Sequence, residues 1–241
     1  FNYRQPYSPV DKNFAIFASG NDGYHLAGYP AAHRDYIAVS AIGPDYLPAF
    51  YTNYGPGSNI AAPGGDASIN RTAESNRAQV LSTVPSECPE YRTDYGYMQG
   101  TSMACPHVSG VAALGLSYAV QLRRHFTADE FKDLLYATAT PIDKYMTGVK
   151  QYKKYVADLE ESSPMMSFDM AGFKGGMGYG QVNAYALLKA IEGAGVEMTF
   201  PNVCVAVGTQ SAIDPSMYMD GTTFTVNVED PSVATAEMVE G

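Results

Sequence analysis

GTSMACPHVSG, residues Gly100 to Gly110, places a serine in a glycine-flanked turn where an apolar helical segment begins. A serine at a helix start is usually an N-cap, whose side-chain oxygen accepts a hydrogen bond from a free backbone N–H group. A nucleophile at the same position gains an oxyanion donor, because its own N–H points toward the site with the positive end of the helix dipole behind it. These few residues leave both roles open for Ser102, as cap and as nucleophile, and one serine at a helix start can perform both.

Length and composition limit the class of protein. The 241 residues suffice for one large α/β domain, or for one domain with a small appendage. A hydrophobic content of 46% with 17% charged residues is typical of a globular chain. The net charge of −10 argues against a nucleic-acid partner, because phosphate binding needs clustered Lys and Arg. No apolar run approaches the roughly 20 residues of a membrane span, so we expect no span in this chain.

Three short apolar runs that end in Gly-rich turns predict buried parallel strands, within residues 13–23, 35–43 and 58–66. A further strand is possible in the apolar run at residues 78–84. The three cysteines of the chain show no C-x-x-C spacing, so they indicate neither a disulfide framework nor a zinc site.

Two helices are expected after these strands. The first is largely apolar and spans residues 102–125, with Arg123 and Arg124 in its last turn, where they complement the helix dipole. The second begins after Thr127, which can form a capping box with Glu130. Strands followed by helices in this order predict an α/β fold with a mostly parallel sheet.

The remaining chain divides into three parts. Residues 141–174 are rich in Met, Lys and Tyr with weak periodicity, which predicts an insertion or extended loop. A Gly-rich turn and a short helix follow within residues 175–193. From residue 196 the sequence alternates and is rich in Val and Thr, so residues 196–241 are expected to form strands of a separate β module after a first domain at residues 1–195.

Two motifs resemble those of the subtilisin-like serine peptidases. Residues 100–110 match the family's nucleophile segment, G-T-S-M-A-x-P-H-V-x-G, at every fixed position. The sequence ASGNDG at residues 18–23 resembles the family's A-[AS]-G-N-x-G loop, in which the asparagine donates to the oxyanion. The resemblance implies that Asn21 has this role and that Ser102 is the nucleophile.

Further segments follow in the family's order. Residues 36–64 resemble the strand, the A-F-S-N-x-G turn and the A-P-G segment, and residues 127–140 resemble the helix after the nucleophile. Residues 178–188 resemble the closing G-x-G-x-[IV]-N-A-x-x-A-[LV] segment. The resemblance covers most of residues 10–192, departs from the family at the longer insertion of residues 141–176, and implies the subtilisin-like three-layer fold. The β tail loosely resembles immunoglobulin-like modules.

The resemblance implies a serine endopeptidase that acts on a protein or peptide substrate. The alternative is an inactive pseudopeptidase or peptide-binding module on the same fold, which would have no need of an intact Ser102 and Asn21. Residues that the resemblance places in substrate binding are Ala18, Ser19 and Gly20 on one side of the primary specificity pocket, Gly28 and Tyr29 near its floor, and Gly100 and Thr101 beside the nucleophile.

The triad of the family runs Asp, His, Ser along the chain. Neither a D-[ST]-G nor an H-G-T segment occurs in the sequence, so we expect the Asp and His to come from an upstream part of the same protein. Without that part, the chain is expected to be inactive and to fold poorly, because an open sheet edge and apolar surface would be exposed.

None of the four histidines is expected to replace the missing base. His107 lies about 140° around the helix from Ser102, so a packed, hydrogen-bonded histidine is expected there. His25 and His33 belong to the loop after Asn21, and His125 is roughly 30 Å along the helix. The aspartates Asp22, Asp35 and Asp94 have no histidine that they are placed to orient.

Cys105 is expected to be an inert, buried thiol.

Expectations about cofactors and location follow from the resemblance alone. No cofactor is required, and structural calcium or a monovalent cation near residues 29–34 has no Asp-rich ligand motif to support it. The resemblance implies a secreted or cell-envelope protein.

Overall fold

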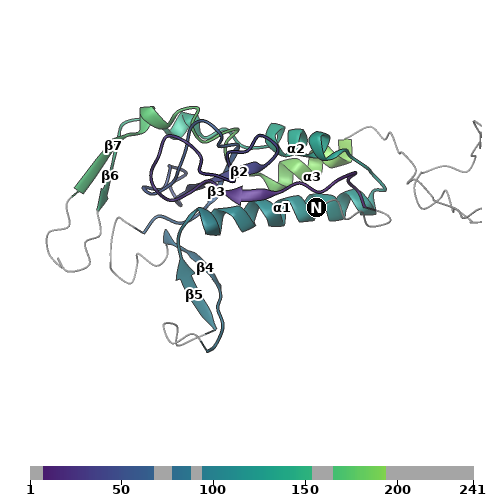
Figure 1. The fold of residues 1–241 in the computed structure, drawn as a ribbon, viewed down its shortest axis with the longest axis horizontal. Coiled ribbons are helices and arrows are strands. Elements are labelled where there is room, and N and C mark those ends of the chain that lie inside the picture. Colours follow the sequence, from purple (N-terminus) through teal and green to yellow (C-terminus); the bar gives the residue numbers. More distant parts are fainter. Residues whose placement is uncertain (1–7, 68–77, 88–93, 154–164, 194–241) are drawn as a thin grey trace, which may run out of the picture.

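The computed structural model describes residues 8–67, 78–87, 94–153 and 165–193 (Figure 1). Its centre is a parallel sheet in the order β1 (Ile16–Ala18), β2 (Ile37–Ile42) and β3 (Ile60–Pro63). Every residue of β2 is buried, as expected for a central parallel strand that is covered on both faces. The three predicted strands and their parallel pairing are confirmed.

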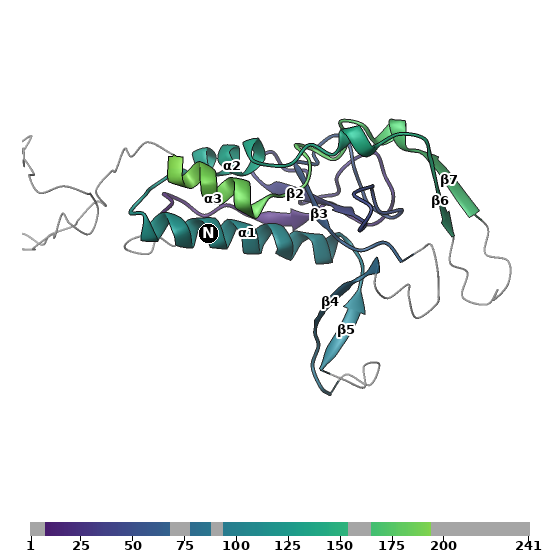
Figure 2. The ribbon, with the colours of Figure 1, turned by 180° about the vertical axis from the view of Figure 1, so that it is seen from behind.

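Helix α1 (Thr101–Gln121) packs along this sheet and against α3 (Ala184–Gly193), as Figures 1 and 2 show. The contact between the helices is close at Gly115, where a Cβ atom would lie 2.8 Å from Leu187 Cδ2. Small residues on α1 therefore allow the two helices and the sheet to share one apolar core.

Both predicted ends of α1 need correction. The N-cap is Gly100, so Ser102 lies within the first turn and is not a cap. The helix ends at Gln121, so Arg123 and Arg124 lie beyond its last turn. Arg123 has a positive φ of 52°, and Arg124 Nη2 donates to the carbonyl of Glu192 at 2.8 Å. Arg124 thus connects the chain after α1 to the end of α3.

The capping box of the second helix is confirmed. In α2 (Ala128–Ala137), the Thr127 hydroxyl accepts from Glu130 N at 3.1 Å, and Glu130 Oε2 accepts from Thr127 N at 2.7 Å. The hydrogen bond from the Thr127 backbone lowers the pKa of the Glu130 carboxyl.

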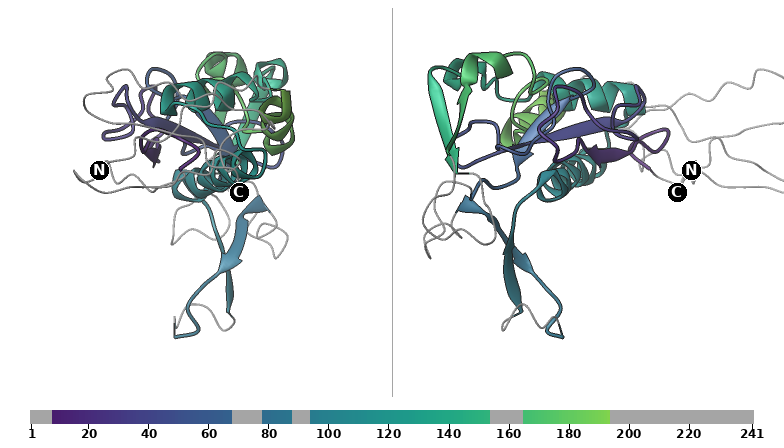
Figure 3. Two further views of the ribbon diagram at one scale, coloured as in Figure 1. Left: turned by 90° about the vertical axis from the view of Figure 1, so that its right-hand side faces the viewer. Right: turned by 60° about the vertical axis from the view of Figure 1, so that its left-hand side comes forward.

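Two antiparallel hairpins extend from the sheet and helices (Figures 2 and 3). The first pairs β4 (Val80–Thr83), which the sequence predicts, with β5 (Tyr95–Met98), which it does not. The second pairs β6 (Val149–Lys153) with β7 (Met165–Asp169), and two short 3₁₀ turns flank it at Asp143–Tyr145 and Met170–Phe173. The loop prediction for the insertion is therefore wrong where β6 and β7 form.

The β6–β7 hairpin lies at the end of the parallel sheet toward which the strands point (Figure 1). In open α/β sheets, sites form at this end, outside the carboxyl ends of the strands. The hairpin is therefore placed next to the region where the candidate site residues are expected. The predicted β module at residues 196–241 lies outside the described residues.

Among the described residues, α1 alone is long and apolar enough to cross a membrane by length and composition. The expectation that no apolar run reaches this length is therefore wrong. One face of the helix packs on β1, β2 and β3 and on α3, and 28% of its apolar 18-residue stretch is buried.

Candidate functional site

The candidate site forms where the loop after β1 meets the start of α1. Asn21 Oδ1 accepts two hydrogen bonds from Thr101, one from the backbone N–H and one from the hydroxyl, each at 2.9 Å. The Thr101 hydroxyl in turn accepts from Gly20 N at 3.3 Å. Two segments that lie 80 residues apart in the chain are thereby joined beside Ser102.

These bonds orient the Asn21 side chain. Because Oδ1 accepts from Thr101, the amide nitrogen is turned away from Thr101. Gly100 shows where that nitrogen lies: a Cβ atom at Gly100 would be 3.6 Å from Asn21 Nδ2 and 3.7 Å from Ser102 N. Asn21 Nδ2 and Ser102 N therefore lie near the same point, next to the exposed Ser102, and Asn21 Oδ1 lies slightly farther from it at 3.8 Å. Gly100 has a φ of 149° and no side chain, which keeps that point open.

Asn53 holds the Asn21 loop from behind, and reasoning from the sequence missed it. Its Oδ1 accepts from the backbone N–H groups of Asp22 at 3.0 Å and Tyr24 at 3.1 Å, and its Nδ2 donates to Ser19 O at 3.2 Å. Asn53 is buried, so its amide replaces water for three backbone groups. The signal was present in the A-F-S-N-x-G turn, where this residue is the asparagine.

The turn before Ser102 rests on the loop after β3. Gly100 N donates to Gly64 O at 2.9 Å, and the Tyr51 hydroxyl donates to Gly64 O at 2.8 Å and Gly65 O at 2.6 Å. Burial raises the pKa of Tyr51 well above its usual range, with a further contribution from the nearby Asp66 carboxylate. Tyr51 is therefore a neutral hydrogen-bond donor at this position.

The residues that the resemblance assigns to the primary pocket lie at the end of β1 and in the loop after it. Ser19 is buried, and its carbonyl accepts from Gly28 N at 2.7 Å, so these two residues are in direct contact. Tyr29 is 82% exposed and lies at the surface. The role of the whole set stays a prediction: Ala18, Ser19, Gly20, Gly28, Tyr29, Gly100 and Thr101.

His107 does not face Ser102 as a base would. Its Nδ1 donates to Met103 O at 2.8 Å, which confirms the expected hydrogen bond, although the residue is exposed and not packed. The His25 ring lies against the Tyr54 ring, tilted by 40° with the ring centroids 4.9 Å apart.

The statement that Asp35 has no histidine partner is wrong. Its Oδ2 lies 3.7 Å from His33 Nδ1, and Asp35 N donates to the same nitrogen at 3.3 Å. Both side chains are largely exposed, and the pair is made within one local turn. We therefore interpret it as a surface contact.

Cys105 is half-buried on α1. Its thiol donates to Ile16 O at 3.5 Å, and burial raises the pKa of the thiol. A protonated thiol that is bonded to the backbone is a poor nucleophile. This environment agrees with the expected inert cysteine.

A buried ion pair connects the insertion to the site region. Lys150 Nζ on β6 lies 2.9 Å from Asp66 Oδ2 and 2.7 Å from Asp45 Oδ2. The side chains of Lys150 and Asp66 are only 6% and 1% exposed. Asp66 directly follows Gly65, and the carbonyl of Gly64 accepts from Gly100 N. The hairpin is therefore linked to the turn before Ser102 through the Lys150–Asp66 pair and this backbone hydrogen bond.

Within residues 8–67, 78–87, 94–153 and 165–193, no three His, Cys, Asp or Glu side chains come together as a metal-binding group. The expectation that no metal is required remains a prediction.

Comparisons with known proteins agree with this geometry. Residues 7–180 match the model of the subtilase family of peptidases. Halolysin from Haloferax mediterranei is 42% identical over 102 residues, which are 42% of this chain and 16% of halolysin. The cell wall-associated protease of Bacillus subtilis is 30% identical over 181 residues, which are 75% of this chain and 17% of that protease. The chain thus spans about a sixth of the length of these two relatives.

Among solved structures, a lanthipeptide protease shares the fold, with a TM-score of 0.50 and 22% identity over 74% of this chain and 50% of that protein. The family model covers the parallel sheet, α1 with Ser102, and the loop with Asn21. The chain therefore belongs to the subtilase family.

Proposed function

We propose that this chain carries the nucleophile and the oxyanion donors of a serine endopeptidase. Ser102 Oγ attacks the carbonyl carbon of a peptide bond, and its proton passes to a histidine base from an upstream part of the same protein, which also supplies the aspartate. The carbonyl oxygen becomes an oxyanion, which accepts hydrogen bonds from Asn21 Nδ2 and Ser102 N. The amine leaves with the proton from the histidine, and water then releases the acyl group from Ser102.

One observation supports this proposal above the others: Asn21 Nδ2 and Ser102 N lie 3.6 and 3.7 Å from the same point beside Gly100. Donors that are fixed before the reaction stabilise developing charge without reorganisation, which is commonly the largest contribution to catalysis in acyl transfer. A module that only binds peptides would gain nothing from an exposed serine at this position.

Reaction with a fluorophosphonate tests the proposal in the full-length protein. We expect a covalent adduct on Ser102, mapped by mass spectrometry, and no adduct in the Ser102→Ala variant. A folded full-length protein that gives no adduct on Ser102 would contradict the peptidase proposal and favour a peptide-binding module.

The remaining parts of the proposal concern partners and location. The substrate is a protein or peptide, and the serine mechanism itself uses no cofactor. Two similar proteins are described as extracellular: a basic protease of Dichelobacter nodosus, 33% identical over 127 residues, and a serine protease of Natrialba magadii, 35% identical over 127 residues. We infer the same extracytoplasmic location for this protein.

A further inference from the structure

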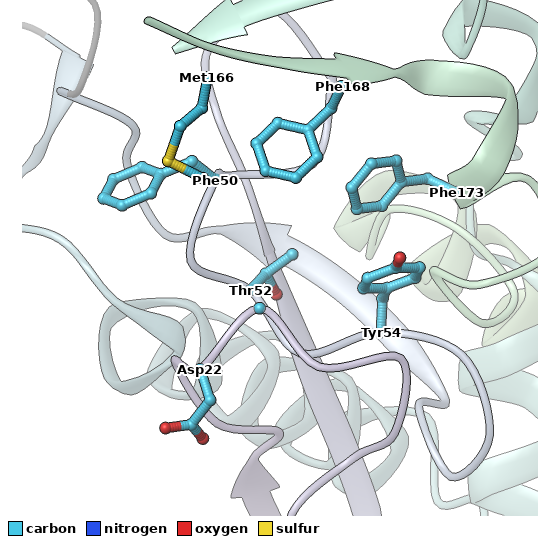
Figure 4. Close-up of a pocket in the computed structure, with 8 residues that line it drawn as sticks. Asp22, Phe50, Thr52, Tyr54, Met166, Phe168 and Phe173 are labelled. Carbon is cyan, nitrogen blue, oxygen red and sulfur yellow. The ribbon is translucent and has the colours of Figure 1, made fainter. Parts of the chain in front are cut away.

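A cavity of about 250 Å³ lies between the Asn21 loop and the β6–β7 hairpin (Figure 4). Five of its eight lining residues are aromatic residues or methionine, and its exposed surface is about equally polar and apolar. Met166 and Phe168 come from β7, Phe173 from the 3₁₀ turn after it, and Phe50 and Tyr54 from the segment before β3. Figure 4 shows the rings of Phe168 and Phe173 above Thr52 and Tyr54, with Met166 beside Phe50.

The cavity adjoins the loop that carries Asn21. Asp22 and Gly23 form part of its wall, and they directly follow Asn21 in the chain. Since consecutive Cα atoms are about 3.8 Å apart, this wall begins within one or two residues of the proposed oxyanion donor. An extended peptide advances about 3.3 to 3.6 Å per residue, so a side chain a few residues from the scissile bond is within reach.

This cavity is separate from the predicted primary pocket. In the described part of the chain, none of Ala18, Ser19, Gly20, Gly28 and Tyr29 lines it. Three of its eight lining residues, Met166, Phe168 and Phe173, come instead from the insertion at residues 141–176, which departs from the family pattern. The insertion thus adds a surface next to the site.

The hairpin wall is held firmly in place. Lys150 joins β6 to Asp66 through a buried ion pair and to the partly exposed Asp45 through a second one. At the other end of the wall, Gly55 N donates to Gly176 O at 2.6 Å, and the Tyr54 and Phe173 rings lie 4.3 Å apart. A wall that is anchored at both ends is preorganised, which lowers the entropic cost of binding.

We propose that this cavity is an accessory subsite that takes one apolar side chain, aromatic or long aliphatic, from a peptide bound across Ser102. The inference rests on the proposed peptidase function. The volume is below the roughly 300 to 1,000 Å³ of pockets for whole small molecules, which favours a single side chain as occupant. Figure 4 shows the Asp22 carboxylate turned away from the Phe168 and Phe173 rings, so these rings form an apolar side of the cavity and Asp22 lies at its edge.

Profiling of the full-length protein on a peptide library tests this subsite. Met166→Trp fills the cavity, and Phe168→Ala enlarges it. Ser167→Ala is the matched control, because Ser167 is exposed on the opposite face of the same strand. All three variants are compared with the unchanged protein by kcat/KM at each substrate position, and fluorophosphonate labelling of Ser102 reports whether the site is intact.

We expect the unchanged protein to prefer a large apolar residue at one position other than the one whose carbonyl is attacked. Met166→Trp should reduce that preference at least about tenfold, Phe168→Ala should shift it toward larger side chains, and Ser167→Ala should leave it unchanged. Identical profiles in all variants, with normal labelling of Ser102, would overturn the subsite and leave the peptidase function standing. Absence of labelling in the unchanged protein would overturn both.

Discussion

The Asn21 loop and the β6–β7 hairpin lie at the same end of the sheet, but different interactions hold them. Neutral, directional hydrogen bonds fix the loop: Thr101 donates to Asn21, and Asn53 accepts from the backbone of the residues that follow Asn21. Charge holds the hairpin, through the buried Lys150–Asp66 pair and the partly exposed Asp45. Amide hydrogen bonds define the direction of a donor, whereas a buried ion pair is strongly unfavourable to separate and so resists displacement. The comparison indicates that the interactions of the loop orient the Asn21 side chain, whereas those of the hairpin keep it attached to the rest of the domain.

The largest expected effect is on activity and comes from substitution of Ser102, which should leave stability almost unchanged. Ser102→Ala in the full-length protein should reduce kcat by several orders of magnitude; subtilisin, a member of the same family, loses about 10⁶-fold when its nucleophile is removed. Because Ser102 is exposed, the free energy of unfolding should change by less than about 0.5 kcal/mol. Hydrolysis assays and urea unfolding measure the two quantities. Retained hydrolysis would show that another residue is the nucleophile.

The next largest effect is expected on the stability of the protein, from substitution of Lys150 in the hairpin. Lys150→Met leaves the Asp66 carboxylate without its buried ammonium partner and should cost about 3 to 5 kcal/mol of unfolding free energy. Lys144→Met is the matched control, because Lys144 is exposed and only lies over the Tyr145 ring, a contact of about 0.5 to 1 kcal/mol. The double variant with Asp66→Asn should recover part of the loss. Equal costs for Lys150→Met and Lys144→Met would mean that charge does not anchor the hairpin.

A smaller effect is expected at Asn21, the proposed oxyanion donor. Asn21→Ala should lower kcat by about 10²- to 10³-fold, the range known for the equivalent asparagine of subtilisin, with KM nearly unchanged. Asn21→Asp tests charge at the same position and should also be slow, because a carboxylate repels an oxyanion. A change confined to KM would assign Asn21 to substrate binding and contradict the oxyanion role.

The smallest effect is expected at the start of α2, which is separate from both the Asn21 loop and the hairpin. Thr127→Ala removes the cap of α2 and should cost about 1 kcal/mol of unfolding free energy, with kcat unchanged. Thr127→Ser retains the hydroxyl and is the control, with a smaller loss. If Thr127→Ala lowered kcat as strongly as Asn21→Ala, activity would report general stability and the distinction between loop and hairpin would fail.

The parts of the fold that were predictable are those with local signals. The apolar runs before Gly-rich turns predicted β1, β2 and β3, and the Thr127–Glu130 pair predicted the start of α2, because each signal lies within one element. The motif around Ser102 predicted the nucleophile segment, and the role of Ser102 as nucleophile stays a prediction. Its cap role was wrong, since the helix begins at Thr101 with Gly100 as its N-cap, and the sequence alone does not show which residue makes the first helical bond.

The parts that escaped prediction depend on distant partners. Nothing near Asn21 indicates that its oxygen is held by Thr101, 80 residues later. Lys150 interrupts an otherwise weak alternation, and its position in a strand makes sense only beside Asp66, 84 residues earlier. The His33–Asp35 contact was missed for the opposite reason, because a tight local turn brings the two side chains together.

The bond between Asn21 and Thr101 has a consequence for measurement. The donor is oriented only while the loop after β1 remains docked on the start of α1, and α1 is held in the apolar core that it shares with the sheet. Partial opening of that core would therefore misalign Asn21 before Ser102 itself lost its helical backbone. In a heated or urea-treated sample, turnover should disappear in step with the loss of tertiary structure and ahead of the loss of helix. The rate of hydrolysis is thus a sensitive probe of whether the Asn21 loop stays docked on the start of α1.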